Sequence, residues 1–235
     1  MDSQGMTMLM NVGRSKGAIA LLVFGAMMVA SAQSAHAVAL SPGATELLPG
    51  TTVAAEPQLA GVVQVDDVVP FSFSAYGGTV SGTVQVRVVE SSVDNTLDFY
   101  WRVFNDAGSA GVIADFRFGD FVTSTYNANY RIDGFGDIAP ISAHRFSGAL
   151  DSYVNFNFGD LLIPGLSSNF FFMDTDATNY AQTAIYDLTN FGQTQISGLY
   201  PMYAPAAVVP EPASLLLLGS GLAGFGLWRR LKTRS

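Results

Sequence analysis

The sequence predicts an all-β fold, an antiparallel β-sandwich or jelly-roll-like domain over residues 61–203. Two observations predict it: short segments alternate apolar and polar residues, and turn-forming residues separate these segments. No window in this region repeats its apolar residues with the 3.6-residue period of a helix. The 17 phenylalanines, 9 tyrosines and 2 tryptophans of the chain also suit inward-facing positions of packed sheets. Many short strands of this kind are typical of sandwiches.

The most clearly patterned strands come first. Residues 78–90 (GTVSGTVQVRVVE) place valines on alternate positions, and residues 97–104 (LDFYWRVF) place Trp101 on an apolar face. The opposite face of 97–104 is amphipathic, a pattern compatible with contact with solvent. Five further segments are predicted as strands: VIADFRF (112–118), YVNFNF (153–158), SNFFFM (168–173), TAIYDL (183–188) and TQISGLY (194–200). Residues 38–60 contain three prolines and little alternation, so they are predicted to form a leader loop.

The charge distribution excludes one class of function. The chain carries 19 acidic and 11 basic residues and no cysteine. Most of the cations lie near the two ends, so the region from Glu46 to Asp187 holds 17 acids against 5 arginines. A nucleic-acid-binding protein needs cations to displace counterions from phosphate, so nucleic acid is not an expected partner. The lack of cysteine excludes disulfides and Cys-ligated metals.

Residues 1–37 have the organisation of a secretory signal peptide. Two cations precede an apolar run at 18–30, and Ala35 and Ala37 then supply the small residues of a cleavage site. Signal peptidase is therefore an expected partner, and a cut after Ala37 would make Val38 the first residue of the mature chain. The alternative is that the apolar run forms a buried helix of the fold.

A second apolar stretch lies at residues 213–228. Its 16 residues are slightly fewer than the ~20 that span a bilayer comfortably, and it is predicted to form a hydrophobic helix. Arg229 and Arg230 open a basic end, 229–235, which would remain in the cytoplasm. The expected localisation is export with transient anchoring in the inner membrane, followed by the cell surface or the extracellular space.

The residues before this stretch carry a specific motif. Within a proline-rich stem at 204–212, Pro210 and Pro212 keep the chain extended around Glu211. Together with the apolar run and the arginines, this tripeptide resembles the PEP-CTERM sorting signal over residues 209–235. The resemblance implies an exported bacterial protein handled by exosortase, a membrane-embedded cysteine peptidase or transpeptidase that recognises and cleaves the Pro-Glu-Pro region. It also implies a Gram-negative source with an exopolysaccharide or biofilm habit. The alternative is an ordinary C-terminal anchor with a proline-rich stem.

The sequence contains few candidates for enzyme chemistry. A Ser-His-Asp triad would need His144, the sole histidine after residue 37, and no Gly-x-Ser-x-Gly elbow accompanies it. A zinc site that needs two or three His or Cys ligands is excluded. Paired carboxylates for glycoside hydrolysis remain open, because any two aspartates could converge in the fold.

No cofactor is expected, and calcium is the metal that the remaining residues could bind. Asp174 and Asp176 begin an oxygen-rich loop of the kind that calcium binds, although an EF-hand pattern is absent. A Phe-Gly-Asp pattern also recurs at 118–120, 135–137 and 158–160. We interpret it as a strand end followed by a turn, since glycine permits a positive φ. A repeated ligand loop is the alternative.

These observations predict a secreted, non-enzymatic protein of the envelope or extracellular matrix, associated with biofilm or exopolysaccharide. Exosortase would sort and cleave it at the tail, and the membrane would hold it through the C-terminal segment before processing. The alternative is a carbohydrate-active hydrolase or a carbohydrate-binding protein built on the same sandwich.

Overall fold

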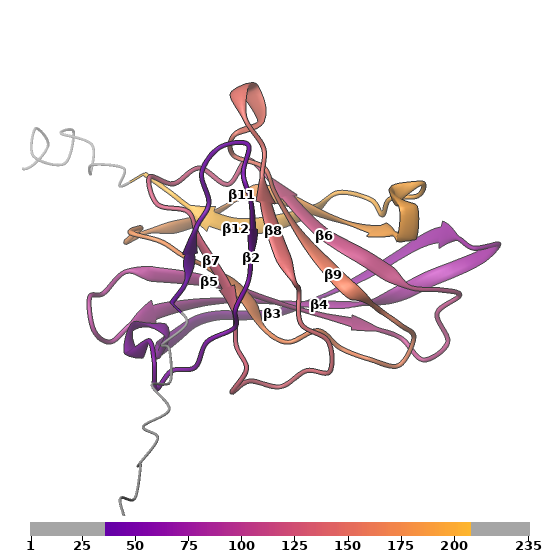
Figure 1. Cartoon of the computed structure of the whole chain (residues 1–235), viewed down its shortest axis with the longest axis horizontal. Coiled ribbons are helices and arrows are strands. Elements are labelled where there is room, and N and C mark those ends of the chain that lie inside the picture. Colours follow the sequence, from indigo (N-terminus) through magenta and orange to yellow (C-terminus); the bar gives the residue numbers. More distant parts are fainter. Residues whose placement is uncertain (1–35, 208–235) are drawn as a thin grey trace, which may run out of the picture. The chain divides into compact units, whose positions relative to one another are not determined.

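The computed structural model describes residues 36–207, and residues 1–35 and 208–235 lie outside the described part. Two six-stranded sheets pack against each other, and all pairs of neighbouring strands are antiparallel (Figure 1). The predicted all-β sandwich is therefore confirmed. The predicted hydrophobic C-terminal helix falls outside the described residues. The predicted signal peptide does too, except for its last two residues, His36 and Ala37.

The first sheet has the strand order β1-β7-β10-β5-β4-β3. Its strands are β1 (Val38–Ala39), β7 (Asn127–Tyr130), β10 (Phe171–Asp174), β5 (Leu97–Asn105), β4 (Gly78–Ser91) and β3 (Gly61–Ala75). The second sheet has the order β12-β11-β6-β9-β8-β2. Its strands are β12 (Tyr200–Pro205), β11 (Tyr180–Asn190), β6 (Ile113–Gly119), β9 (Val154–Leu162), β8 (Ser142–Arg145) and β2 (Thr45–Leu47). Three short 3-10 helices complete the described fold: η1 (Pro57–Leu59), η2 (Gly148–Leu150) and η3 (Phe191–Gln193).

The core between the sheets is aromatic and has Trp101 of β5 among its fully buried side chains. The indole ring is 0% exposed, as the alternation in residues 97–104 predicts. It packs against five phenylalanine rings with centroid separations of 5.1 to 6.4 Å: Phe116, Phe118, Phe121, Phe156 and Phe171. Because these rings come from both sheets and from the turn after β6, the indole joins the two layers.

One predicted strand is wrong in position. Residues 194–200 were expected to form a strand, but β12 begins only at Tyr200. The chain turns at Gly192 and Gln193, whose φ angles are 80° and 53°, and only an isolated bridge at Ile196 then meets β11. Most of TQISGLY therefore lies outside a regular strand, and its residue pairings with β11 are the bridge at Ile196 and the pairing of Tyr200 with Tyr186. The short strands β7 and β8 were not predicted, because four residues give too little alternation to identify a strand.

Residues 38–60 differ from the predicted leader loop. Within them β1 joins the first sheet, β2 joins the second, and η1 follows. Three leucines of this segment, Leu40, Leu48 and Leu59, are almost completely buried. Burial of these side chains removes apolar surface from water, which favours docking of the segment. The folded domain therefore begins near Val38 rather than at residue 61.

Candidate functional site

The outer face of the first sheet is covered where the sequence pattern is compatible with contact with solvent. Asp98 and Tyr100 project from β5 on the face opposite Trp101, yet they are only 1% and 3% exposed. Tyr100 packs with Leu59, Val89 and aromatic residues in a second apolar cluster, and its hydroxyl donates to the Leu59 carbonyl at 3.0 Å. This face therefore does not meet solvent here, because the chain around η1 folds over it.

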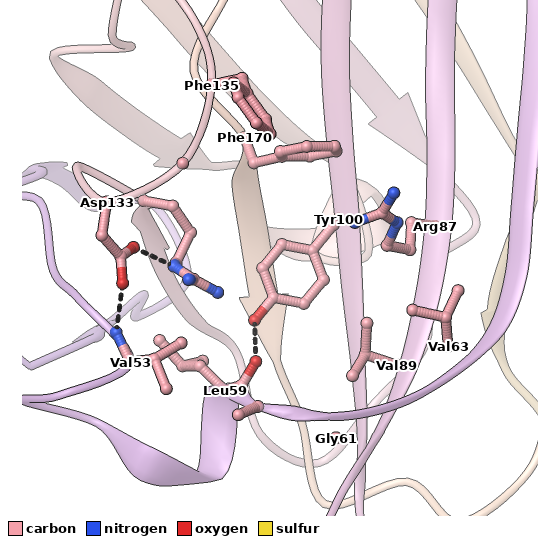
Figure 2. Close-up of a pocket in the computed structure, with 13 residues that line it drawn as sticks. Val53, Leu59, Gly61, Val63, Arg87, Val89, Tyr100, Asp133, Phe135 and Phe170 are labelled. Carbon is pink, nitrogen blue, oxygen red and sulfur yellow. Dashed lines mark hydrogen bonds and ion pairs between the residues drawn. The ribbon is translucent and has the colours of Figure 1, made fainter.

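A cavity of about 350 Å³ lies beside this cover. Figure 2 shows Tyr100 on one side with its hydroxyl directed at Leu59, and the rings of Phe170 and Phe135 close together on another side. Phe135 is 76% exposed, so it offers an aromatic ring to solvent at the edge of the cavity. The volume is within the ~300–1,000 Å³ usual for small-ligand sites. The cavity is therefore the candidate binding site among the described residues.

Two arginines bring positive charge to this cavity. Arg131 Nε lies 2.5 Å from Asp133 Oδ1, and Arg87 Nη2 lies 2.7 Å from Asp66 Oδ2. Burial would raise the pKa of Asp133, but hydrogen bonds from Arg131 and from the Val53 N–H outweigh it and hold the pKa below its usual range. Asp133 thus stays ionised and helps to fix the Arg131 guanidinium at the cavity wall (Figure 2).

A buried carboxyl pair lies on the same face of the sheet. Asp98 of β5 stands opposite Asp174 of β10 in the strand register, and both Asp98 oxygens are buried. Burial, and then the nearby carboxylates of Asp174, Asp94 and Glu56, raise the pKa of Asp98 to about 9. Burial and the carboxylates of Glu56 and Asp94 raise the pKa of Asp174 to about 6. Asp98 is therefore protonated at neutral pH.

This titration predicts a stabilising substitution. An unfolded Asp98 has an ordinary pKa near ~4, so folding takes up a proton between about pH 4 and pH 9 and stability falls as pH rises through this window. Asp98→Asn removes the titrating group and keeps its shape. We expect it to increase the free energy of unfolding by about 2–4 kcal/mol at pH 7 and by much less at pH 4. Urea unfolding at the two pH values measures this, and an equal effect at both would contradict it.

The two aspartates considered for calcium make different contacts. Asp174 faces Asp98, whereas the Asp176 carboxylate accepts hydrogen bonds from the Thr123 and Ser124 hydroxyls. Within residues 36–207, no group of three or more His, Cys, Asp or Glu side chains is arranged to hold a metal ion. The calcium site at Asp174 and Asp176 stays a prediction without a third acidic ligand.

The remaining sequence candidates occupy separate positions. His144 lies on β8, where its Nδ1 is 2.8 Å from Thr45 Oγ1 and its ring packs edge-on against Phe146. The first Phe-Gly-Asp pattern ends β6 and turns at Asp120, whose φ is 59°. The pattern at 158–160 instead lies inside β9, so it does not mark a strand end there.

The sorting residues lie outside the described part of the chain: Pro210, Glu211, Pro212, Arg229 and Arg230, together with Ala35 of the expected signal cleavage site. Ala37 is described, and its N–H donates to Glu56 Oε1 at 2.8 Å. At the other end, the Ala206 N–H donates to the Asn179 carbonyl directly after β12. In the described range 36–207, no helix is long and apolar enough to cross a membrane.

The fold and the tail together define a β-sandwich protein with a C-terminal sorting sequence. Residues 208–230 match the family described as the PEP-CTERM protein-sorting motif. This match contains the Pro-Glu-Pro tripeptide and both arginines, so the resemblance drawn from the sequence is confirmed. The motif implies an exported protein whose sorting depends on exosortase. Searches of the curated proteins and of the solved structures gave no match to the chain.

Proposed function

We propose that this chain is a secreted, non-enzymatic component of the envelope or extracellular matrix, delivered by exosortase cleavage of its tail. The observation that carries the proposal is the sorting motif at residues 208–230, which follows closely on a sandwich whose strands end at Pro205. In this proposal the tail directs sorting, and the sandwich domain is the part that is delivered. A structural or adhesive role fits a compact aromatic core with an acidic surface, which keeps a β-rich protein soluble.

The position of the carboxylates supports the non-enzymatic role. A glycoside hydrolase needs two carboxyl groups that reach its substrate. The pair that converges here, Asp98 and Asp174, does not line the cavity beside Tyr100, and Asp98 is 1% exposed. A substrate would have to displace the segment that covers this pair before it reached Asp98.

The spacing between the domain and the motif constrains processing. Five residues separate Pro205, the end of β12, from Glu211. A chain of this length spans at most ~20 Å when fully extended. While the apolar stretch at 213–228 anchors the protein, the folded sandwich is therefore held next to the membrane surface, within reach of a membrane-embedded peptidase.

The proposal is tested by locating the native protein in cells with and without a functional exosortase. With the enzyme, mass spectrometry should find a chain that ends near the Pro-Glu-Pro region, at the cell surface or in the medium. Without it, the protein should remain in the membrane fraction with residues 213–235 attached. Identical termini and distributions in the two strains would contradict exosortase processing.

A second candidate function is binding of an acidic carbohydrate in the cavity beside Tyr100. The specific observation is the combination of the exposed Phe135 ring with two arginines, Arg87 and Arg131, in an otherwise acidic domain. An aromatic ring can pack against the apolar face of a sugar, and a guanidinium can bind a uronate carboxylate through two hydrogen bonds. Neutral sugars have no carboxylate and would therefore lack the contact with the guanidinium.

This candidate predicts selective loss of binding in two variants. Phe135→Ala and Arg131→Gln should each weaken binding of an acidic oligosaccharide, such as an oligouronate, by about tenfold or more. Titration calorimetry measures the effect, with Phe191→Ala as the matched control because Phe191 is also largely exposed but lies outside the cavity lining. Equal affinity of all three variants, or equal binding of neutral oligosaccharides, would contradict the assignment.

A further inference from the structure

Glu56 is a buried carboxylate that contacts the first described residues of the chain. The residue is 2% exposed. Its Oε1 accepts the Ala37 N–H at 2.8 Å and lies 3.4 Å from Nδ1 of His36. Its Oε2 is also buried and has no hydrogen-bond partner among the described residues. A buried carboxylate with an unused oxygen is costly unless a cation or further donors meet it.

The surroundings of Glu56 add negative charge. Asp94 and Asp174 carry this charge, whereas Asp98 is protonated at neutral pH, and Glu56 is close enough to raise the pKa of both Asp98 and Asp174. Within residues 36–207, the arginines that form ion pairs do so with Asp66, Asp187 and Asp133, and none of them pairs with this group. The cation that lies beside Glu56 is the His36 imidazole when it is protonated.

We propose that Glu56 is the receptor for the α-ammonium group that signal-peptide cleavage creates at Val38. This inference rests on the proposed export of the chain and on the cut after Ala37. That cut removes two groups that now contact Oε1, the Ala37 N–H and the His36 imidazole, and leaves the Gln58 amide, whose Nε2 donates to Oε1 at 3.5 Å. It places a positive charge one residue further along, at the first residue of β1, next to the residue whose N–H now reaches Glu56 Oε1.

The chemical change is simple and balanced. Water adds its hydroxyl to the Ala37 carbonyl carbon and a hydrogen to the Val38 nitrogen as the peptide bond breaks, and the amine then takes up a proton at neutral pH. A peptide N–H is one neutral donor, whereas the ammonium group offers three donors and a full charge. In the cleaved protein Glu56 thus gains a charged partner with three donors in place of the His36 imidazole, so cleavage stabilises the fold. The uncleaved precursor lacks this pair, which suits a chain that must cross a membrane before it folds.

The sequence allows a selective test. The two lysines of the chain, Lys16 and Lys232, lie in the segments removed by signal cleavage and by tail processing. The processed protein that begins at Val38 therefore has a single amine, its own N-terminus. Acetic acid N-hydroxysuccinimide ester, followed by hydroxylamine to free any tyrosine, acetylates this amine and no other. Mass spectrometry of the purified mature protein first establishes that Val38 is the N-terminal residue.

The main experiment compares free and acetylated protein in the wild type and in Glu56→Gln. In the wild type, acetylation should lower Tm by about 5–10 °C, as expected for loss of a buried ion-pair partner in a domain of this size. In Glu56→Gln the same acetylation should change Tm by less than about 2 °C. Glu90→Gln is the matched control, because Glu90 lies on β4 and accepts a hydrogen bond from exposed Gln64. It should retain the full wild-type response.

A second measurement does not depend on any variant. Reductive methylation with ¹³C-formaldehyde labels the same amine, and its single NMR signal reports the pKa of the α-amino group. Pairing with Glu56 should raise that pKa above the ordinary ~7.7–8.0. An ordinary pKa together with a Tm that does not respond to acetylation would overturn the inference while leaving export intact. A mature N-terminus at another residue would instead contradict the proposed cleavage.

Discussion

Replacing Trp101 by alanine should lower the free energy of unfolding by about 3–5 kcal/mol, the range for emptying a large aromatic site in a core. The indole is 0% exposed and contacts five phenylalanine rings from both sheets, so no single neighbour can move in to fill the space. A domain with a total stability of roughly 5–15 kcal/mol would lose a large part of it. Urea unfolding followed by circular dichroism measures the change.

The matched control is Phe135→Ala. This side chain is also aromatic, but 76% of it is exposed, so its removal leaves no cavity. The control should change the free energy of unfolding by no more than about 0.5 kcal/mol, as is usual for surface positions. A loss below about 1 kcal/mol in Trp101→Ala would mean that the indole does not occupy the core.

Glu211→Ala should block removal of the tail without affecting the fold. Pro210 and Pro212 fix their own φ angles and lack N–H donors, so the segment cannot easily enter a helix or a sheet. From the sequence, Glu211 is therefore expected in an extended peptide that precedes the apolar stretch. We expect the variant to accumulate in the membrane fraction of the producing host, heavier by the tail. Cell fractionation and intact-mass measurement test this.

Two comparisons make the result specific. The Glu211→Ala domain should unfold at the same urea concentration as the wild type, because five residues separate the end of β12 from the substituted position. Replacing Arg229 and Arg230 by serine should weaken retention before cleavage and let unprocessed chain escape, because these charges are expected to hold the far end in the cytoplasm. If Glu211→Ala matures and distributes like the wild type, the tripeptide is not the recognition element.

Local patterns predicted a substantial part of this molecule. The alternation in β4 and β5 predicted both strands and the buried face of Trp101, because side chains of a strand point alternately to opposite sides. The sorting motif at residues 208–230 could also be recognised, since it is a short continuous pattern in the sequence. Short or irregular elements could not be predicted in this way. Strands β7 and β8 have only four residues each, and most of the alternating segment 194–200 precedes β12.

The sequence by itself determined the all-β class, the buried faces of β4 and β5 and the sorting motif of the tail. Each of these features depends on the order of residues that are close together in the chain. Only the tertiary structure decided what covers the outer face of β5. The alternation places Asp98 and Tyr100 on a face compatible with solvent, yet a segment some 40 residues earlier folds over them and brings Glu56 beside the first residues of the domain. Such contacts depend on packing between segments that are distant in the sequence, and this packing produces no periodic pattern in the sequence of either segment.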